Sequence, residues 1–249
     1  MRIVRAMVEG EGFYAVLTDK LRRLAGAPYG GLDYTGEEYN PSEAVLLPPC
    51  EPSKLVCVGK NYYAHALEMK EGNPAEPLLF LKPSTCLVGE GGDVRYPALS
   101  SRVEYEGELA VVIGKRAWQV PQGGSGEYIF GYTCANDVTA RDIQKGDPQW
   151  TRGKCFDTFC PLGPWIETQL DAQNTLLETR LNGELRQTSD TRLMTHSIDK
   201  LIWYITQCMT LLPGDVVLTG TPAGVGPMQK GDVVEVEIRG IGRLRNRIV

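Results

Sequence analysis

The sequence predicts a β-rich α+β protein whose sheets form a sandwich or a rolled sheet, with a small N-terminal domain. Three observations support this fold class. Short apolar stretches recur along the chain, each bounded by Gly, Pro or Gly-Asp. The 28 Gly and 16 Pro among 249 residues indicate many turns. The strand-like stretches do not alternate with long helical patterns, which argues against a doubly wound parallel sheet.

The first 50 residues look like a separate small layer. Two strand-like stretches, Ile3–Val8 and Phe13–Leu17, flank the turn Glu9–Gly12, which is a hairpin signal. A Pro-, Gly- and Tyr-rich segment then leads to Leu46–Pro49, where we place a boundary. We therefore divide the chain into an N-terminal domain, residues 1–50, and a main domain, residues 51–249.

The main domain contains eight short apolar stretches that read as strands. They are Lys54–Val58, Leu78–Leu81, Leu109–Ile113, Ile129–Thr133, Leu176–Leu181, Val216–Thr219, Val233–Ile238 and Leu244–Val249. Two segments predict helices. Tyr62–Met69 is long enough for about two turns, and Ser197–Leu211 combines a Ser N-cap with apolar residues at helical spacing.

The charge balance excludes some classes of partner. The chain has 26 Lys and Arg against 31 Asp and Glu, a net charge of −5. Nucleic acids and anionic membranes are bound by basic surfaces, so we expect neither as a partner. A small anionic substrate needs only a local cation and stays compatible with this balance.

The location expected from the sequence is cytoplasmic. The N-terminus shows no signal peptide, and no apolar stretch is long enough to span a membrane. The seven cysteines are odd in number and contain no C-x-x-C pair. We therefore expect reduced, mostly buried thiols.

Three glutamates form the most informative pattern in the chain. Glu104, Glu106 and Glu108 alternate along a strand-like segment, so all three carboxylates would leave one face. Crowded carboxylates repel one another unless a cation neutralises them, and oxygen ligands favour Mg²⁺ or Mn²⁺. An exposed edge strand that uses charge against aggregation is the alternative interpretation.

A second acidic position lies directly after a predicted strand. Asp137 lies in the segment Asn136–Asp142, which follows the apolar stretch at 129–133. Two glutamates from one strand and one aspartate from a neighbour would suit a Mg²⁺ ion that keeps some water and substrate ligands. The alternative role of Asp137 is the N-cap of a helix at 138–145.

One short helix carries a candidate acid–base pair. His65 and Glu68 are three positions apart, so their side chains meet on a helical turn. A carboxylate that holds one imidazole nitrogen raises the basicity of the other. The polar segment Lys70–Pro77 that follows has the composition of a lid, which would bring His65 into play when it closes. An exposed helix face is the alternative interpretation.

Taken together, the motifs resemble the fumarylacetoacetate hydrolase family. The resemblance is carried, in the expected order over residues 54–248, by Gly59–Tyr62 with His65, Leu79–Pro83, Glu104–Val112, Asn136–Asp142 and Thr219–Gly226. The chain looks closest to the compact acylpyruvate hydrolase and oxaloacetate decarboxylase members. Lys60 departs from the Arg that close relatives often carry, and residues 1–50 match no motif of the family.

The resemblance implies a fold, a cofactor and a set of site residues. The fold is a mixed β-sandwich roll, usually dimeric. The cofactor is Mg²⁺ or Mn²⁺ held by Glu106, Glu108 and Asp137, with Glu104 outside the metal set. His65 and Glu68 would handle the catalytic water, and Lys154, by itself an ordinary surface charge, would contact substrate oxygens. Arg141, Gln144 and Thr221 would line the substrate site.

The expected function is cleavage of a 2,4-dioxo acid or of oxaloacetate through a metal-stabilised pyruvate enolate. Isomerisation of a 2-hydroxyhepta-2,4-diene-1,7-dioate and keto–enol tautomerisation of oxaloacetate are the alternatives within enzymes. A non-catalytic metal-binding protein of the same fold is the alternative from another class. The expected partners are a small 2-oxo acid and a second copy of the chain, in a homodimer.

Overall fold

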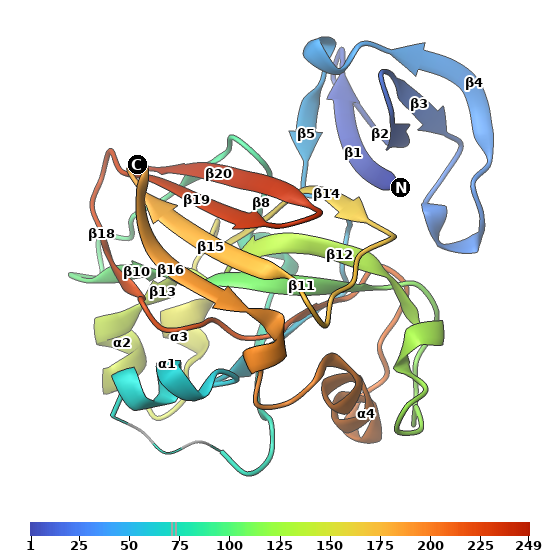
Figure 1. Cartoon of the computed structure of the whole chain (residues 1–249). Helices are drawn as coiled ribbons and strands as arrows, with labels where there is room; N and C mark the ends of the chain where they lie inside the picture. Colours follow the sequence, from blue (N-terminus) through green and yellow to red (C-terminus); the bar gives the residue numbers. More distant parts are fainter. Residues whose placement is uncertain (71, 73) are drawn as a thin grey trace.

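The computed structural model describes residues 1–70, 72 and 74–249, and these residues form a β-rich fold with few and short helices (Figure 1). The α-helices are α1 (Tyr63–Glu68), α2 (Arg141–Gly146), α3 (Thr151–Lys154) and α4 (Ile198–Cys208). Single 3₁₀ turns are η1 (Pro28–Gly30), η2 (Pro41–Glu43), η3 (Ser84–Cys86), η4 (Ser125–Glu127) and η5 (Thr191–Leu193). The predicted β-rich α+β class is confirmed.

The described strands form three sheets, of twelve, five and three strands. Along the largest sheet the order is β4 (Tyr34–Tyr39), β3 (Leu21–Leu24), β2 (Glu11–Leu17), β1 (Arg2–Val8), β14 (Cys160–Glu167), β12 (Ile129–Asn136), β11 (Gly107–Ile113), β17 (Val216–Leu218), β6 (Leu55–Gly59) and β7 (Leu78–Lys82). Two further strands join it, β5 (Val45–Leu47) on β1 and β8 (Leu87–Val88) on β14.

The two smaller sheets complete the β structure. The five-stranded sheet has the order β16 (Glu184–Asp190), β15 (Leu176–Leu181), β19 (Val233–Ile238), β20 (Gly242–Ile248) and β9 (Asp93–Val94). The three-stranded sheet has the order β13 (Thr139–Ala140), β10 (Val103–Tyr105) and β18 (Gly226–Met228). Figure 1 shows the five-stranded sheet lying across β11 and β12, with α1, α2 and α3 gathered at one end.

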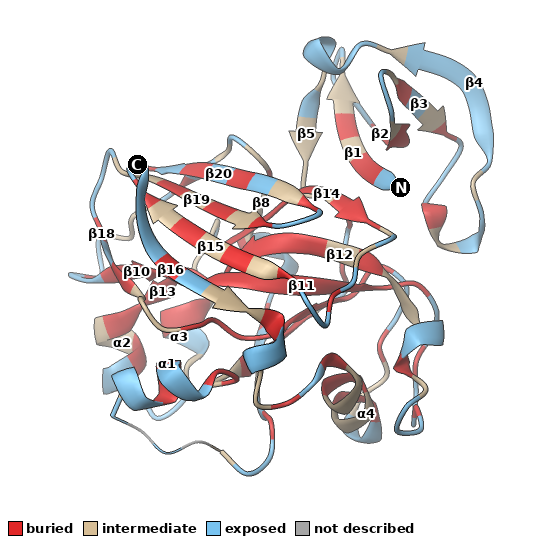
Figure 2. Ribbon diagram, viewed as in Figure 1, coloured by how far each residue is buried: buried red, intermediate tan, exposed pale blue. Residues whose placement is uncertain are grey.

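The central strand β11 is buried on both faces, which explains its continuous apolar sequence. Leu109, Val111 and Ile113 face a core shared with the five-stranded sheet and α4. Ala110 and Val112 face a second core that includes residues of β1, β2 and β14. In Figure 2, β11 and β12 are among the most completely buried elements. This strand is therefore a rigid base for the residues at its N-terminal end.

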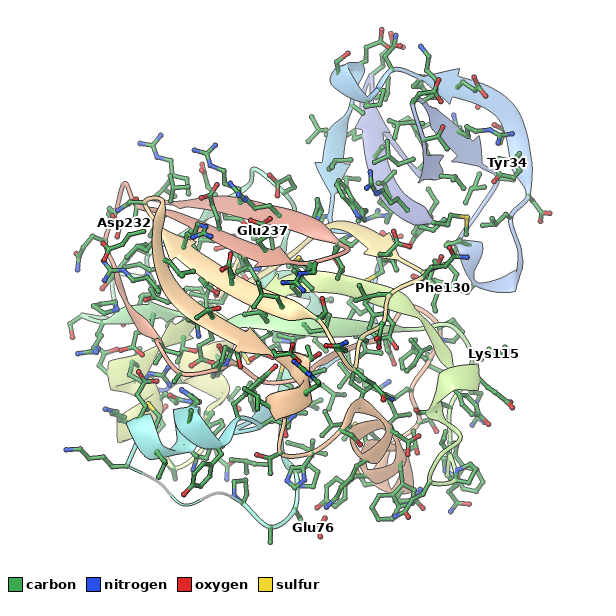
Figure 3. All side chains as sticks on the ribbon, viewed as in Figure 1. Tyr34, Glu76, Lys115, Phe130, Asp232 and Glu237 are labelled. Atoms are coloured by element: carbon green, nitrogen blue, oxygen red, sulfur yellow. The ribbon has the colours of Figure 1, made fainter. Side chains whose placement is uncertain are left out.

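The N-terminal residues form a lobe that stands apart from the main body in Figure 1, yet its sheet continues into the main sheet. Arg2 and Ile3 of β1 pair antiparallel with Glu167 and Ile166 of β14. Figure 3 labels Phe130 of β12, whose ring meets the ring of Tyr29 from the lobe edge-on, with centroids 5.1 Å apart. The lobe thus contacts the main body through both backbone and side chains.

The structure contains several strands that the sequence pattern did not predict. β14 contains Pro161 and Pro164, which are rare in central strands and hid it from the pattern. β16 is polar apart from Leu185, so it lacks the apolar alternation that marks a strand, and it was missed. The eight predicted main-domain strands and the two predicted helices are present, with ends shifted by a few residues at most.

All seven cysteines lie in the described part of the chain and are free thiols, five of them buried. Within the same residues no helix is long and apolar enough to cross a membrane.

Candidate active site and metal centre

Strand register brings the predicted metal ligands together. In the antiparallel pair of β11 and β12, Gly107 lies opposite Asn136, and the next backbone hydrogen bond joins the N–H of Asp137 to the carbonyl of Glu106 at 2.8 Å. Glu106 and Asp137 are therefore neighbours across the ladder. One carboxylate oxygen each from Glu106, Glu108 and Asp137 lie within 4.8 Å of one another, and all three residues are buried.

The three glutamates of the sequence pattern do not share one strand. The chain leaves the three-stranded sheet after β10 and enters the large sheet at β11, and Glu106 lies at the break. Glu104 stays with the smaller sheet, where its two oxygens accept from the Nε atoms of Arg102 and Arg141, both at 2.6 Å. The expectation that the three glutamates share one strand was wrong, because the strand breaks between sheets, but Glu104 and Glu106 still reach the same Arg141 guanidinium.

Asp137 is not a helix N-cap. The helix after it, α2, begins at Arg141, and the residue at its N-cap position is Ala140. Asp137 uses its carboxylate instead to bind two ammonium groups. Lys82 pairs with Oδ1, and Lys154 donates to Oδ2 at 2.5 Å.

Buried cations surround the carboxylates. Lys154 of α3 also donates to Glu106 Oε2 at 2.7 Å, and the Arg141 guanidinium pairs with the other oxygen of Glu106. Four buried carboxylates, Glu104, Glu106, Glu108 and Asp137, thus face three buried cations, Lys82, Arg141 and Lys154. When all four carboxylates are ionised, as metal binding requires, four negative and three positive charges leave a net charge of −1, which a divalent cation would change to +1.

The charges push the pKa values of two of the glutamates in opposite directions. Burial acts to raise the pKa of Glu106, but Lys154 and Arg141 outweigh it, so this pKa lies below its ordinary value. Burial together with the charges of Asp137 and Glu106 raises the pKa of Glu108 well above its ordinary value. An all-oxygen set that holds excess negative charge fits a hard divalent cation such as Mg²⁺ or Mn²⁺.

The predicted acid–base pair forms on α1. His65 Nδ1 lies 3.2 Å from Glu68 Oε2, and His65 is buried while the Glu68 side chain is about one-third exposed. The backbone N–H of Gly224 donates to both oxygens of Glu68. Of the predicted lid segment that follows α1, residues 71 and 73 lie outside the described residues.

A cavity of about 270 Å³ opens onto both groups. Its lining includes eight of the nine predicted site residues, namely His65, Glu106, Glu108, Asp137, Arg141, Gln144, Lys154 and Thr221, and the ninth, Glu68, lies beside His65. Phe80 and Trp150 form an aromatic wall, with ring centroids 5.3 Å apart. Gly59 allows this wall to close, because a Cβ there would lie 2.7 Å from the Trp150 ring.

The contacts of Arg141 and Thr221 are with other protein groups. Arg141 donates to Glu104, Glu106 and Gln144, so it holds the carboxylates in place. The Thr221 hydroxyl donates to the Gly107 carbonyl at 2.9 Å. Contact of these residues with a substrate stays a prediction.

Two positioning residues escaped the sequence reasoning. Gln187 of β16 accepts from the Gly107 N–H and donates to Thr221, which ties the start of β11 to the loop after β17. Lys82 is 1% exposed at the end of β7. A lone Gln in a polar stretch carries no signal. A Lys at the end of an apolar strand, directly before Pro83, could have indicated a buried cation paired with an acid.

Comparison with known proteins gives this geometry a context. Residues 54–249 match the family described as fumarylacetoacetate (FAA) hydrolase C-terminal, and residues 1–49 match the one described as Rv2993c-like, N-terminal. The chain is 48% identical to Protein Rv2993c of Mycobacterium tuberculosis over 92% of this chain and 87% of that protein. It is 43% identical to a Bos taurus protein named oxaloacetate tautomerase FAHD2B, mitochondrial, over 82% of this chain and 69% of the other.

A solved structure agrees over the whole chain. The crystal structure named 5-carboxymethyl-2-hydroxymuconate delta-isomerase, from Mycobacterium smegmatis, has a TM-score of 0.95 to this chain at 43% identity, and the match covers 100% of this chain and 99% of that one. The sequence match, the shared fold and the cluster of buried acids lead to one conclusion. The chain belongs to the fumarylacetoacetate hydrolase family.

Proposed function

We propose that this enzyme uses Mg²⁺ or Mn²⁺ to cleave a C–C bond in a 2,4-dioxo acid or in oxaloacetate, with pyruvate enolate as the leaving fragment. One observation carries the proposal: the cluster Glu106, Glu108 and Asp137 shares a cavity with His65, whose Nδ1 is held by Glu68. A carboxylate cluster alone binds a cation, whereas a carboxylate–imidazole pair beside it supplies the base that hydrolysis needs.

The metal would be held by Glu106, Glu108 and Asp137, and when bound it would supply Lewis-acid stabilisation of negative charge on substrate oxygens. In the proposed role, Glu68 accepts a hydrogen bond from His65 Nδ1–H, which leaves Nε2 to take a proton from water. Lys154 stabilises negative charge that develops on the substrate. Arg141 keeps Glu106 and Gln144 in position through its guanidinium. The net charge of +1 with a divalent cation suits an anionic substrate.

Proton transfer without cleavage is the second candidate, and the names of two relatives favour it. One is called an oxaloacetate tautomerase and the other a delta-isomerase. Both reactions need an enolate and a base but no attack by water. In these reactions His65 would move a proton between carbon and oxygen of the substrate.

Turnover assays with two substrates test the proposal. Acetylpyruvate and oxaloacetate are each incubated with Mg²⁺, with Mn²⁺ and with a chelator, while pyruvate release and enol absorbance are followed separately. Metal-dependent pyruvate release supports cleavage. A change in enol absorbance without pyruvate identifies a tautomerase. Absence of both reactions with tightly bound metal would favour the non-catalytic metal-binding protein.

A further inference from the structure

The three carboxylates of the cluster share one feature: each has one oxygen already held by a fixed donor. Lys82 holds Asp137 Oδ1, Arg141 holds Glu106 Oε1, and the backbone N–H of Gly220 donates to Glu108 Oε2 at 2.6 Å. The other oxygens of Asp137 and Glu106 accept from the Lys154 ammonium, at 2.5 and 2.7 Å, so a cation bound here would take the place of that ammonium. With the first set of donors still in place, each carboxylate would offer the cation one oxygen.

Lys82 is fixed by burial and by a second hydrogen bond. Its side chain is fully buried, and its ammonium also donates to the Val138 carbonyl at 3.2 Å. Its other near neighbours include the buried thiols Cys57, Cys86 and Cys160. A buried ammonium is costly without an anionic partner, so Lys82 stays on Asp137.

The way a carboxylate binds decides which ion fits. Mg²⁺ demands near-ideal octahedral geometry and suits carboxylates that give one oxygen each. Ca²⁺ takes six to eight oxygens and gains from carboxylates that give both. We propose that Lys82 is a positioning residue that keeps Asp137 a one-oxygen ligand and thereby makes the site select a small octahedral cation over Ca²⁺. This inference rests on the metal centre of the proposed function.

The test compares ion selectivity rather than affinity. Replacing Lys82 removes a positive charge beside the site, which changes the affinities for Mg²⁺ and Ca²⁺ by the same electrostatic factor because both ions carry the same charge. That factor cancels in the ratio of the two dissociation constants. A change in ligation geometry does not cancel, so the ratio isolates the role of Lys82.

Titration calorimetry of metal-stripped protein with Mg²⁺ and with Ca²⁺ gives this ratio. We expect the wild type to prefer Mg²⁺. In Lys82→Met the ratio of the two dissociation constants should shift toward Ca²⁺ on the order of tenfold. This is the lower end of the effect of losing a hydrogen-bond partner of a metal ligand. Lys82→Arg keeps a donor and should keep the ratio. Lys54→Met is the matched control, since Lys54 pairs with the buried Asp215 outside the site.

A second measurement needs no variant and covers a failure of Lys82→Met to fold. Infrared difference spectra of ¹³C-aspartate-labelled wild type, with and without Ca²⁺, report whether the aspartate ligand gives one oxygen or two. One-oxygen ligation of Ca²⁺ supports the inference. Two-oxygen ligation, or an unchanged ratio in folded Lys82→Met, overturns it. Wild type that binds neither ion would instead remove the metal centre, and with it the proposed function.

Discussion

The backbone N–H of Gly224 donates to both carboxylate oxygens of Glu68, at 3.1 and 3.2 Å, and so connects the loop after β17 to helix α1. The Tyr105 hydroxyl donates to the carbonyl of the same glycine at 2.9 Å. Tyr105 lies directly before the metal-ligand position Glu106. Gly224 is thus held through its N–H by Glu68 and through its carbonyl by Tyr105. These contacts fix Glu68 and, through it, the imidazole of His65.

Gly224→Ala tests this connection. Gly224 has φ +102°, and a Cβ there would lie 2.2 Å from the Arg186 carbonyl oxygen, so the loop must move and the N–H leaves Glu68. We expect kcat to fall on the order of tenfold, less than the 10²–10⁴-fold expected for complete loss of a general base, because the imidazole itself is still present. Gly231→Ala is the control, with φ +96° and open space around its Cβ position. Equal kcat in the two variants would contradict the role of Gly224.

His65→Ala separates cleavage by water from proton transfer and decarboxylation. Loss of the base should lower kcat for acetylpyruvate on the order of 10²–10⁴-fold. Decarboxylation of oxaloacetate needs no attacking water and should fall less. Glu68→Gln should cost less than His65→Ala for either substrate, because the amide keeps a hydrogen bond. Steady-state kinetics with bound metal quantified gives the comparison, and unchanged hydrolysis in His65→Ala would remove the pair from the mechanism.

Glu108→Gln and Glu104→Gln distinguish the metal ligands from their neighbour. Glu108 belongs to the cluster, so its variant should lose metal binding and metal-supported activity. Glu104 binds Arg102 and Arg141 instead, so its variant should still bind metal but unfold more easily, by about 1–3 kcal/mol for a broken buried charge contact. Metal content and denaturant titration are the measurements. Loss of metal in Glu104→Gln alone would reverse this assignment.

Asp142 predicts how stability depends on pH. Burial acts to raise its pKa, but hydrogen bonds from Ser100, Ser101 and the Ile143 N–H outweigh it and lower the pKa to about 2. A carboxyl whose folded pKa lies below its unfolded value stabilises the fold above the unfolded pKa of 3.8, and this contribution is lost as pH falls toward the folded value. Denaturant titrations at several pH values should therefore show that the wild type has a larger free energy of unfolding than Asp142→Asn above pH 3.8. The two free energies should approach each other as the pH falls toward the folded pKa of about 2. A pH-independent difference would refute the linkage.

The homodimer expected from the family resemblance predicts the mass in solution. Light scattering should give one species of twice 27.4 kDa. An active monomer would show that assembly is not needed for function.

Much of the fold followed from local pattern. The strands β15 and β19 were predicted with their observed bounds, and the capped, amphipathic helix α4 was predicted to within three residues, because burial and capping leave a periodic signal in the sequence. The prolines of β14 and the polar residues of β16 concealed strands whose pairing depends on distant partners.

The sequence by itself determined which side chains could form the site: the acids around Glu106, the spacing of His65 and Glu68, and an ordered set of motifs. Only the tertiary structure decided how they are used. The register of β11 and β12 places Asp137 beside Glu106, while Glu104 stays in the smaller sheet and binds Arg102 and Arg141. Lys82 reaches Asp137 across 55 positions of sequence. Such contacts depend on strand order and burial, and neither is written in local spacing, because distant segments meet only when the sheets assemble.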